Sequence, residues 1–370
     1  MAANNVLGII FSNANDEVIP ELTALRTMGS IPFAGRYRLI DFPLSNMVNA
    51  GITKVGVITK SNYRSLMDHI GSGKAWDLSR KREGMTILPP YNLPGTGMIK
   101  GKVDALYNSI NYIENSGKDH VLLTDCNVVC NMDYEALYKA HIANDADVTI
   151  AYAKGIPPKM EANTEIIMDE NSRITATKLL DCYSSEVNYS LKVMIIRRTL
   201  LERLLHESHS LKVDDFETMI GNNVKHIRIY GYEVTGYVKV IGSLQSYYDI
   251  SLDLLKLANR KELFTADRPV YTKVRDEVPA TYGIGANVKN SLIADGCRID
   301  GEVENSILFR GVTVAKGAKI KNSIVMQGSF IGENSTLDCV IIDKEAVLKP
   351  GKMLCGALNY PVYIGKGIVI

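Results

Sequence analysis

The loop that follows the first apolar run is the first feature of this chain that bears on chemistry. The run NVLGIIF, residues 5–11, is short and apolar and ends in turn-forming residues, which predicts a buried β-strand. In nucleotide-binding α/β domains the next loop carries glycines, because they let backbone N–H groups approach phosphates. Here no glycine lies between Gly8 and Gly29, and residues 13–16 read NAND. The strand is therefore present without its phosphate loop.

Cysteine and histidine give no second chemical signature. The cysteines form no CxxC pair and have no neighbouring histidine pattern, so the sequence favours buried, reduced thiols over a metal site or disulfides. The histidines are scattered, and we expect His69 in DHIGSG to make a structural hydrogen bond. The cysteines are Cys126, Cys130, Cys182, Cys297, Cys339 and Cys355.

Length and charge bound the class of protein. The chain has 370 residues, which suggests two domains. Its net charge is +1 with no run of one sign, so nothing indicates a nucleic-acid partner. No apolar segment is long enough to cross a bilayer and no signal peptide opens the sequence, so we expect a cytoplasmic protein with no membrane partner.

The first two thirds of the chain alternate strand-like and helical patterns. This βαβ succession predicts a mostly parallel sheet covered by helices, in a domain spanning residues 1–264. The pattern predicts strands over 54–60, 120–130 and 146–154 and helices over 104–117, 131–145 and 162–172.

The last third repeats itself. NSLIADGC (290–297), NSILFRGV (305–312) and NSIVMQGS (322–329) are close copies at nearly even spacing. Such a repeat predicts stacked coils of a parallel β-helix over residues 288–370, because one coil alone cannot bury its apolar face. A β-sandwich is the alternative. Residues 265–287 contain prolines without helical periodicity and read as a linker.

Six segments, in order, resemble the bacterial ADP-glucose pyrophosphorylase family, also called glucose-1-phosphate adenylyltransferase. The resemblance covers nearly the whole chain and implies a Rossmann-like, mostly parallel nucleotidyltransferase domain followed by a C-terminal left-handed parallel β-helix. The family joins ATP to glucose-1-phosphate, which requires cations, backbone amides and carboxylates that hold Mg²⁺. The segments are 31–73, 76–91, 100–113, 131–141, 236–255 and 268–282.

The family's phosphate-binding positions have changed type in this chain. By resemblance, the glycines of the phosphate loop fall on Asn13, Ala14 and Asp16, and the arginine of that loop falls on Val18. The lysine of the following Lys-Pro pair falls on Met28. An aspartate repels a triphosphate, and losing the glycines restricts the approach of the backbone.

The metal-binding positions have changed as well. By resemblance, the two metal aspartates fall on Asn127 and Val240, and a substrate lysine falls on Thr218. Asp125 lies two residues before Asn127 and could replace it only with a register shift. We therefore expect that the family's Mg²⁺ site is lost, that no cofactor is bound and that no catalytic residue remains.

Other family positions are retained. Arg36, Arg38 and Asp41 in GRYRLIDF lie where the family has residues near its activator site, and either a regulatory role or salt bridges at a strand–helix junction fit them. Asp104 occupies a family aspartate position, and Lys102 replaces a threonine beside it. A residual nucleotide or sugar-phosphate pocket is therefore possible there.

A fold that is retained while its chemistry is lost resembles the GlgD-type branch of this family. The resemblance implies a non-catalytic regulatory subunit that raises the activity of a catalytic ADP-glucose pyrophosphorylase subunit in a hetero-oligomer, such as a tetramer. Two alternatives remain at the level of sequence. One is a weakly active adenylyltransferase, and the other is a stand-alone sensor of sugar phosphate or nucleotide that forms a homo-oligomer.

Overall fold

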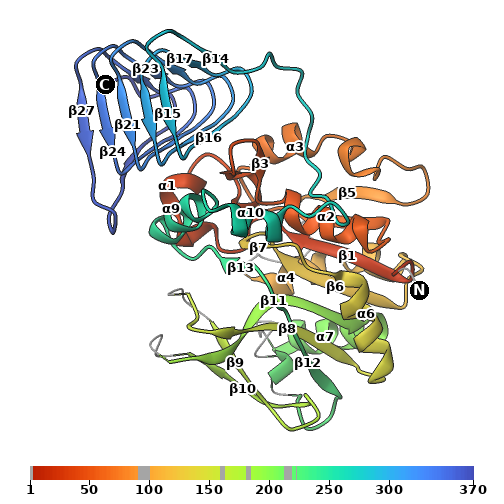
Figure 1. Cartoon of the computed structure of the whole chain (residues 1–370). Helices are drawn as coiled ribbons and strands as arrows, with labels where there is room; N and C mark the ends of the chain where they lie inside the picture. The colour runs from red at the N-terminus through yellow and green to blue at the C-terminus, as the bar shows by residue number, and fades with distance from the viewer. Residues whose placement is uncertain (1–2, 91–100, 159–162, 181–184, 212–218, 222) are drawn as a thin grey trace.

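The structure is a computed structural model, which describes residues 3–90, 101–158, 163–180, 185–211, 219–221 and 223–370. Figure 1 shows two bodies: a sheet surrounded by helices, and a stack of coils at one end of the molecule, near α1 (Pro20–Thr23) and α9 (Leu244–Asp253). No helix in the described ranges combines the length and apolar character needed to cross a membrane.

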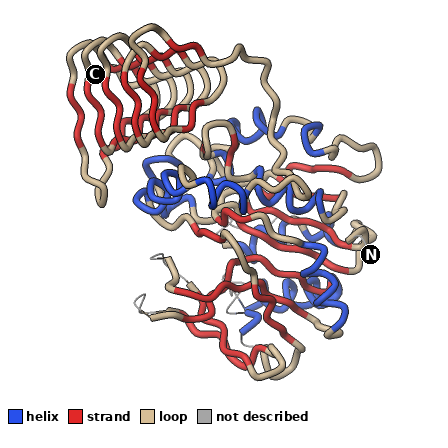
Figure 2. Tube along the Cα trace, viewed as in Figure 1, coloured by secondary structure: helices blue, strands red, loops and turns tan. Residues whose placement is uncertain are grey.

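A nine-stranded sheet forms the centre of the first body. Seven strands follow the order β10-β9-β11-β6-β1-β4-β5, while β8 pairs with β11 and β12 pairs with β8. Figure 2 shows these strands running through the body with helices beside them. The strands are β1 (Val6–Phe11), β4 (Lys54–Ile58), β5 (Gly84–Leu88), β6 (His120–Asp125), β8 (Val148–Gly155), β9 (Thr164–Met168), β10 (Ile174–Leu179), β11 (Val187–Arg197) and β12 (Ile229–Glu233).

Strand direction divides this sheet into two parts. Strands β6, β1, β4 and β5 are parallel, whereas β11 is antiparallel to β6, β8 and β9. The carboxyl ends of the parallel strands therefore meet at one edge, where Phe11 is in register with both Ile58 and Asp125. Ligands of such sheets bind beyond this edge.

Helices cover both faces of the sheet. Alternate β1 side chains show this, because Leu7 and Ile9 belong to the same apolar cluster as residues of α4 and α7, whereas Ile10 packs in a second cluster with residues of α2 and α6. The other helices and turns lie around these layers. The helices are α2 (Asp41–Asn49), α3 (Arg64–Ile70), α4 (Lys102–Asn108), α5 (Ile110–Glu114), α6 (Tyr134–Ala143), α7 (Arg198–Leu211) and α10 (Leu257–Leu263), and the 3₁₀ turns are η1 (Asp16–Val18), η2 (Met28–Ser30) and η3 (Lys74–Trp76).

Three of the predicted elements differ in the structure. The helix predicted over 162–172 is wrong, because β9 and β10 form an antiparallel hairpin there around Asp169, whose Oδ1 accepts two backbone N–H bonds in the turn. The strand predicted over 120–130 breaks into β6 and β7 (Val128–Cys130), and β7 pairs with β13 (Val238–Val240). The helix predicted over 104–117 is α4 followed by α5.

The C-terminal body is a left-handed parallel β-helix whose coils contribute one strand to each of three parallel five-stranded sheets. Strand pairing begins at β14, so it includes part of the segment predicted as a linker. The sheets consist of β14 (Thr281–Tyr282), β17 (Arg298–Ile299), β20 (Thr313–Val314), β23 (Phe330–Ile331) and β26 (Val347–Leu348); β15 (Asn287–Lys289), β18 (Glu302–Glu304), β21 (Lys319–Lys321), β24 (Thr336–Asp338) and β27 (Met353–Cys355); and β16 (Leu292–Ile293), β19 (Ile307–Leu308), β22 (Ile324–Val325), β25 (Val340–Ile342) and β28 (Val362–Ile364).

The repeated Asn-Ser pair has a structural cause. Asn290, Asn305 and Asn322 have positive φ angles at equivalent corners of successive coils, a conformation that asparagine tolerates better than most residues. The serine that follows each asparagine bonds between coils, and the Ser306 Oγ accepts the backbone N–H of Ser323 at 3.1 Å. The repeated Asn-Ser pair therefore marks the same corner in successive coils.

The two bodies share one hydrophobic cluster. Ile307, Phe309 and Ile324 of the β-helix are buried together with core residues of the sheet domain. A buried ion pair also joins them. The Nη2 of Arg26 donates to both carboxylate oxygens of Asp343, at 2.6 and 2.8 Å. The two bodies are therefore held together by both apolar and ionic contacts.

Strands β2 (Pro32–Phe33) and β3 (Tyr37–Arg38) form an antiparallel hairpin.

The described cysteines are reduced, four of them buried and Cys355 exposed. Cys182 lies outside the described residues.

Candidate functional site

The loop after β1 closes on itself through side-chain hydrogen bonds. The Asn13 Nδ2 donates to Oδ2 of Asp16 at 2.6 Å, and the other oxygen of Asp16 accepts the backbone N–H of Met28 at 2.7 Å. The Asn13 Oδ1 accepts the backbone N–H of Lys60 at 2.7 Å. Three of the altered phosphate-binding positions are thus brought together: Asp16 bonds to Asn13 of the same loop and to Met28 of the former Lys-Pro pair.

The carboxyl group of Asp16 serves as the anion of this loop. Burial raises the pKa of Asp16 to about 6, although the hydrogen bonds from Asn13 and from the N–H of Met28 act in the opposite direction. A backbone N–H that a phosphate could accept is therefore already bonded to a carboxylate of the chain.

The two other loop positions are apolar and pack inward. Ala14 packs against the cluster beneath α4 and α7, and Val18 packs against the cluster on the other side of the sheet. Neither side chain offers a charge to a phosphate, which agrees with the departure noted in the sequence.

Asn127 and Val240 lie on the two facing segments of the β7–β13 ladder, where each makes a structural contact. Val240 pairs with Val128 across the β7–β13 ladder. The Asn127 Nδ2 donates to the carbonyl oxygen of Ile241 at 3.2 Å, and the N–H of Ile241 donates to the carbonyl oxygen of Asn127 at 2.8 Å. The fold thus brings together the two positions that the resemblance assigns to one metal site, with an amide and an alkyl group in place of the carboxylates.

Asp125 is the carboxylate nearest in sequence to these positions, and it is already paired. Its Oδ2 lies 2.6 Å from the Nζ of Lys102 and 3.3 Å from the Nδ2 of Asn15, and its side chain is 1% exposed. Sequence reasoning singled out Lys102 and Asp125 separately and did not pair them. Their charges of opposite sign were the available signal.

A family magnesium ion does not fit this set of donors. Mg²⁺ is held through one or two carboxylates together with waters and phosphates. Here one family position is an amide bonded to Ile241, one is Val240, and Asp125 is neutralised by Lys102. Among the residues that the structure describes, no group of three or more His, Cys, Asp or Glu side chains could hold a metal ion.

The retained GRYRLIDF residues form a buried junction. Asp41 is fully buried and contacts His69 Nε2 at 2.5 Å, and its second oxygen accepts the backbone N–H of Arg38. The Arg38 guanidinium donates to the carbonyl and hydroxyl oxygens of Ser65, and burial lowers its pKa to about 10. Burial also lowers the pKa of His69, against the opposing effect of Asp41.

Arg36 and Asp104 differ from this junction. Arg36 is exposed, and its guanidinium carbon lies 5.7 Å from the centre of the Tyr37 ring. Asp104 is half-buried in the first turn of α4, where a carboxylate interacts favourably with the helix dipole. Thr218 lies outside the described residues.

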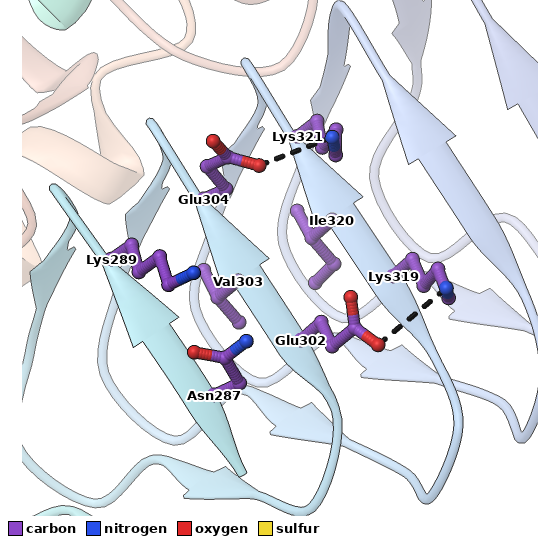
Figure 3. Close-up of a pocket in the computed structure, with 8 residues that line it drawn as sticks. All are labelled: Asn287, Lys289, Glu302, Val303, Glu304, Lys319, Ile320 and Lys321. Carbon is purple, nitrogen blue, oxygen red and sulfur yellow. Dashed lines mark ion pairs between the residues drawn. The ribbon is translucent and has the colours of Figure 1, made fainter.

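Figure 3 shows a pocket on the outer face of the β-helix, lined by side chains of β15, β18 and β21. Charges of opposite sign alternate between its coils, with Glu302 paired to Lys319 at 3.5 Å and Glu304 to Lys321 at 3.1 Å. Exposed pairs of this kind contribute little free energy. The pocket is a solvated ladder of charges.

Comparison with known proteins agrees with the fold. The nucleotidyl transferase family matches residues 19–176, and a GlmU-like C-terminal hexapeptide family matches residues 278–357. The first match thus begins after the altered loop of residues 13–18. A nucleotidyltransferase-type sheet domain with hexapeptide coils defines the chain as a protein of the nucleotidyltransferase class.

Individual relatives narrow this class. The chain is 36% identical over 369 residues to the glycogen biosynthesis protein GlgD of Bacillus subtilis (strain 168), covering 100% of this chain and 98% of that protein. It is 32% identical over 341 residues to the glucose-1-phosphate adenylyltransferase of Clostridium perfringens (strain SM101 / Type A), covering 90% and 87%. It is 30% identical over 375 residues to the same enzyme of Bacillus cytotoxicus, covering 98% and 99%. The chain belongs to the glucose-1-phosphate adenylyltransferase family.

Proposed function

We propose that this chain is a catalytically deficient, regulatory subunit in glycogen biosynthesis. It assembles with a catalytic glucose-1-phosphate adenylyltransferase in a cytoplasmic hetero-oligomer, such as a tetramer, and raises the rate at which that partner makes ADP-glucose from ATP and glucose-1-phosphate. It binds no Mg²⁺ and contributes no catalytic residue to this reaction.

The loop after β1 is the observation that carries this proposal. The Asp16 carboxylate occupies the N–H of Met28 and the amide of Asn13, so a triphosphate entering the loop would meet a negative charge where an enzyme offers donors. Losing one electrostatic contributor typically lowers a rate about 10²–10³-fold. This chain has replaced the loop donors and both metal carboxylates together.

A subunit without chemistry acts through its affinity for the states of its partner. It raises the partner's rate when it binds the partner's active arrangement more tightly than the inactive one. Rigid attachment between the two bodies favours such a role, since Arg26, Asp343 and the shared core keep them in one arrangement. Arg36, exposed beside the β-helix, is our candidate for a contact with an anionic effector.

The test is ADP-glucose synthesis from ATP and glucose-1-phosphate with Mg²⁺ in three samples: this chain, the catalytic homologue of the same cell, and the two co-expressed and purified as a complex. We expect no rate above background from this chain and a higher maximal rate from the complex than from the homologue. The proposal is wrong if the co-expressed proteins do not associate, or if the complex is no faster than the homologue.

A weakly active enzyme is the second candidate, and Asp125 is the observation that favours it. This carboxylate lies at the carboxyl end of β6, in register with the end of β1. ADP-glucose formation by the pure chain that disappears in Asp125→Asn would support this candidate. A stand-alone sensor, by contrast, would bind ATP or glucose-1-phosphate in calorimetry as a homo-oligomer and leave the homologue's rate unchanged.

A further inference from the structure

A half-buried ion pair lies close in sequence to a position that has lost its metal carboxylate, Asn127. The Lys102 ammonium on α4 contacts the Asp125 Oδ2 at the end of β6, and Asn15 from the loop after β1 reaches the same oxygen. An isolated carboxylate that is 1% exposed is strongly destabilising, so this one requires a cation. Lys102 supplies it from within the chain.

Only one oxygen of this carboxylate is occupied. In the described part of the chain, Oδ1 of Asp125 is buried and has no hydrogen-bond partner. A buried acceptor without a donor costs free energy, and a carboxylate that is open at one oxygen can accept a donor or a cation there. The site therefore retains the capacity of a cation ligand while its charge is balanced.

The position of Lys102 explains how the ammonium is held. Its side chain is 31% exposed, and its Nζ lies 5.4 Å from the centre of the Phe11 ring, which attracts a cation. An ammonium carries one charge and only donors, so it can neutralise Asp125. Its single charge is balanced by Asp125, whereas the two charges of a magnesium ion offset a carboxylate and also the charge of a phosphate in phosphoryl transfer.

We propose that the Lys102 ammonium is a permanent replacement for a divalent cation at Asp125, and that removing it exposes a latent divalent-cation site. The ligands of that site are the two carboxylate oxygens of Asp125 and the side-chain oxygen of Asn15. Rotation of the Asn15 amide turns this oxygen toward the cation. Waters complete the coordination. This replacement is independent of the regulatory role, because it concerns the charge balance of this chain alone.

The test uses the full chain and Mn²⁺ as the probe. Lys102→Met keeps the length of the side chain and removes its charge. In the absence of metal we expect this variant to melt several degrees below the wild type, and to regain at least half of that loss in millimolar MnCl2. Binding measured by Mn²⁺ electron paramagnetic resonance should have a Kd of about 10⁻⁴–10⁻³ M, as for weak oxygen sites, and the wild type should bind at least tenfold more weakly.

Two variants separate this effect from a general loss of stability. Lys102→Met combined with Asp125→Asn removes both charges, so it should melt closer to the wild type and ignore Mn²⁺. Lys256→Met removes a lysine from an exposed pair with Asp253 and should change neither readout. If Lys102→Met does not fold, Lys102→Gln carries the same test.

Either of two results overturns the replacement. One is Mn²⁺ binding by the wild type with the affinity of the Lys102 variant, which means that the lysine excludes no cation. The other is a folded Lys102 variant that neither binds Mn²⁺ nor gains stability from it. Neither result bears on the rate of the co-expressed complex, so the two proposals can fail separately.

Discussion

The buried pair between Arg26 and Asp343 permits a quantitative test of the joint between the two bodies. The two side chains are 3% and 2% exposed, and Tyr363 Oη also donates to the carboxylate at 2.9 Å. Asp343→Asn leaves the guanidinium buried without a counter-charge. Removing one partner of a buried pair typically costs about 3–5 kcal/mol, and we expect a loss of this size.

Urea unfolding followed by tryptophan fluorescence is a suitable assay. The only tryptophan, Trp76, is buried in the sheet domain, whereas Asp343 belongs to the β-helix. If the shared core makes the bodies one cooperative unit, Asp343→Asn lowers the urea midpoint that Trp76 reports. The control is Asp253→Asn, which breaks the exposed pair with Lys256 and should cost less than about 1 kcal/mol.

A double variant provides a second test of the ionic contact. Arg26→Met combined with Asp343→Leu removes both charges and should recover most of the loss, because apolar replacement of a buried pair is often neutral or stabilising. A cost of Asp343→Asn no larger than that of the exposed control would refute the ionic part of the joint. A β-helix that loses stability while the Trp76 transition stays in place would refute the cooperative part.

Three further measurements test other features. Asp16 has its pKa raised to about 6 in the folded chain, so the folded state binds the proton more tightly and stability should fall as the pH rises from about 4 to 6; Asp16→Asn should remove this dependence in urea midpoints across that range. Burial lowers the pKa of Lys344 to about 7, so stability should rise between about pH 7 and 10, and Lys344→Met should raise the midpoint at pH 7 and abolish the rise. Ser323→Ala, which leaves the buried N–H of Val340 without its acceptor, should cost about 1–3 kcal/mol by calorimetry, and Thr175→Ala, which removes an exposed hydroxyl bond to the carbonyl oxygen of Ile167, distinctly less.

Local pattern predicted the regular parts of the fold. The three Asn-Ser copies were sufficient to predict coils, because each asparagine sits at a corner with positive φ and each serine bonds at the same place in its coil. The apolar run of residues 5–11 likewise predicted β1, because its alternate side chains meet different helices. Where the same residue types make the same turn and the same bond at a regular spacing, the repeat in the sequence predicts the local structure.

Two predicted elements were wrong because pairing with other strands overrides the local pattern. A helix was predicted over 162–172, but residues 164–168 form β9, since β10 and β11 offer backbone partners and Ile166 enters the core. The strand expected over 120–130 breaks at Asn127, because β13 pairs with β7 there. Residue propensity cannot report such partners.

The sequence by itself determined the family, the two kinds of architecture and the residue types at the altered phosphate and metal positions. Only the tertiary structure decided which groups meet. Asp16 accepts the backbone N–H of Met28, Lys102 neutralises Asp125, and Arg26 of the sheet domain pairs with Asp343 of the β-helix. The physical reason is distance along the chain. These pairs lie 12, 23 and 317 residues apart, and only the folding of the intervening elements brings the partners within hydrogen-bond range.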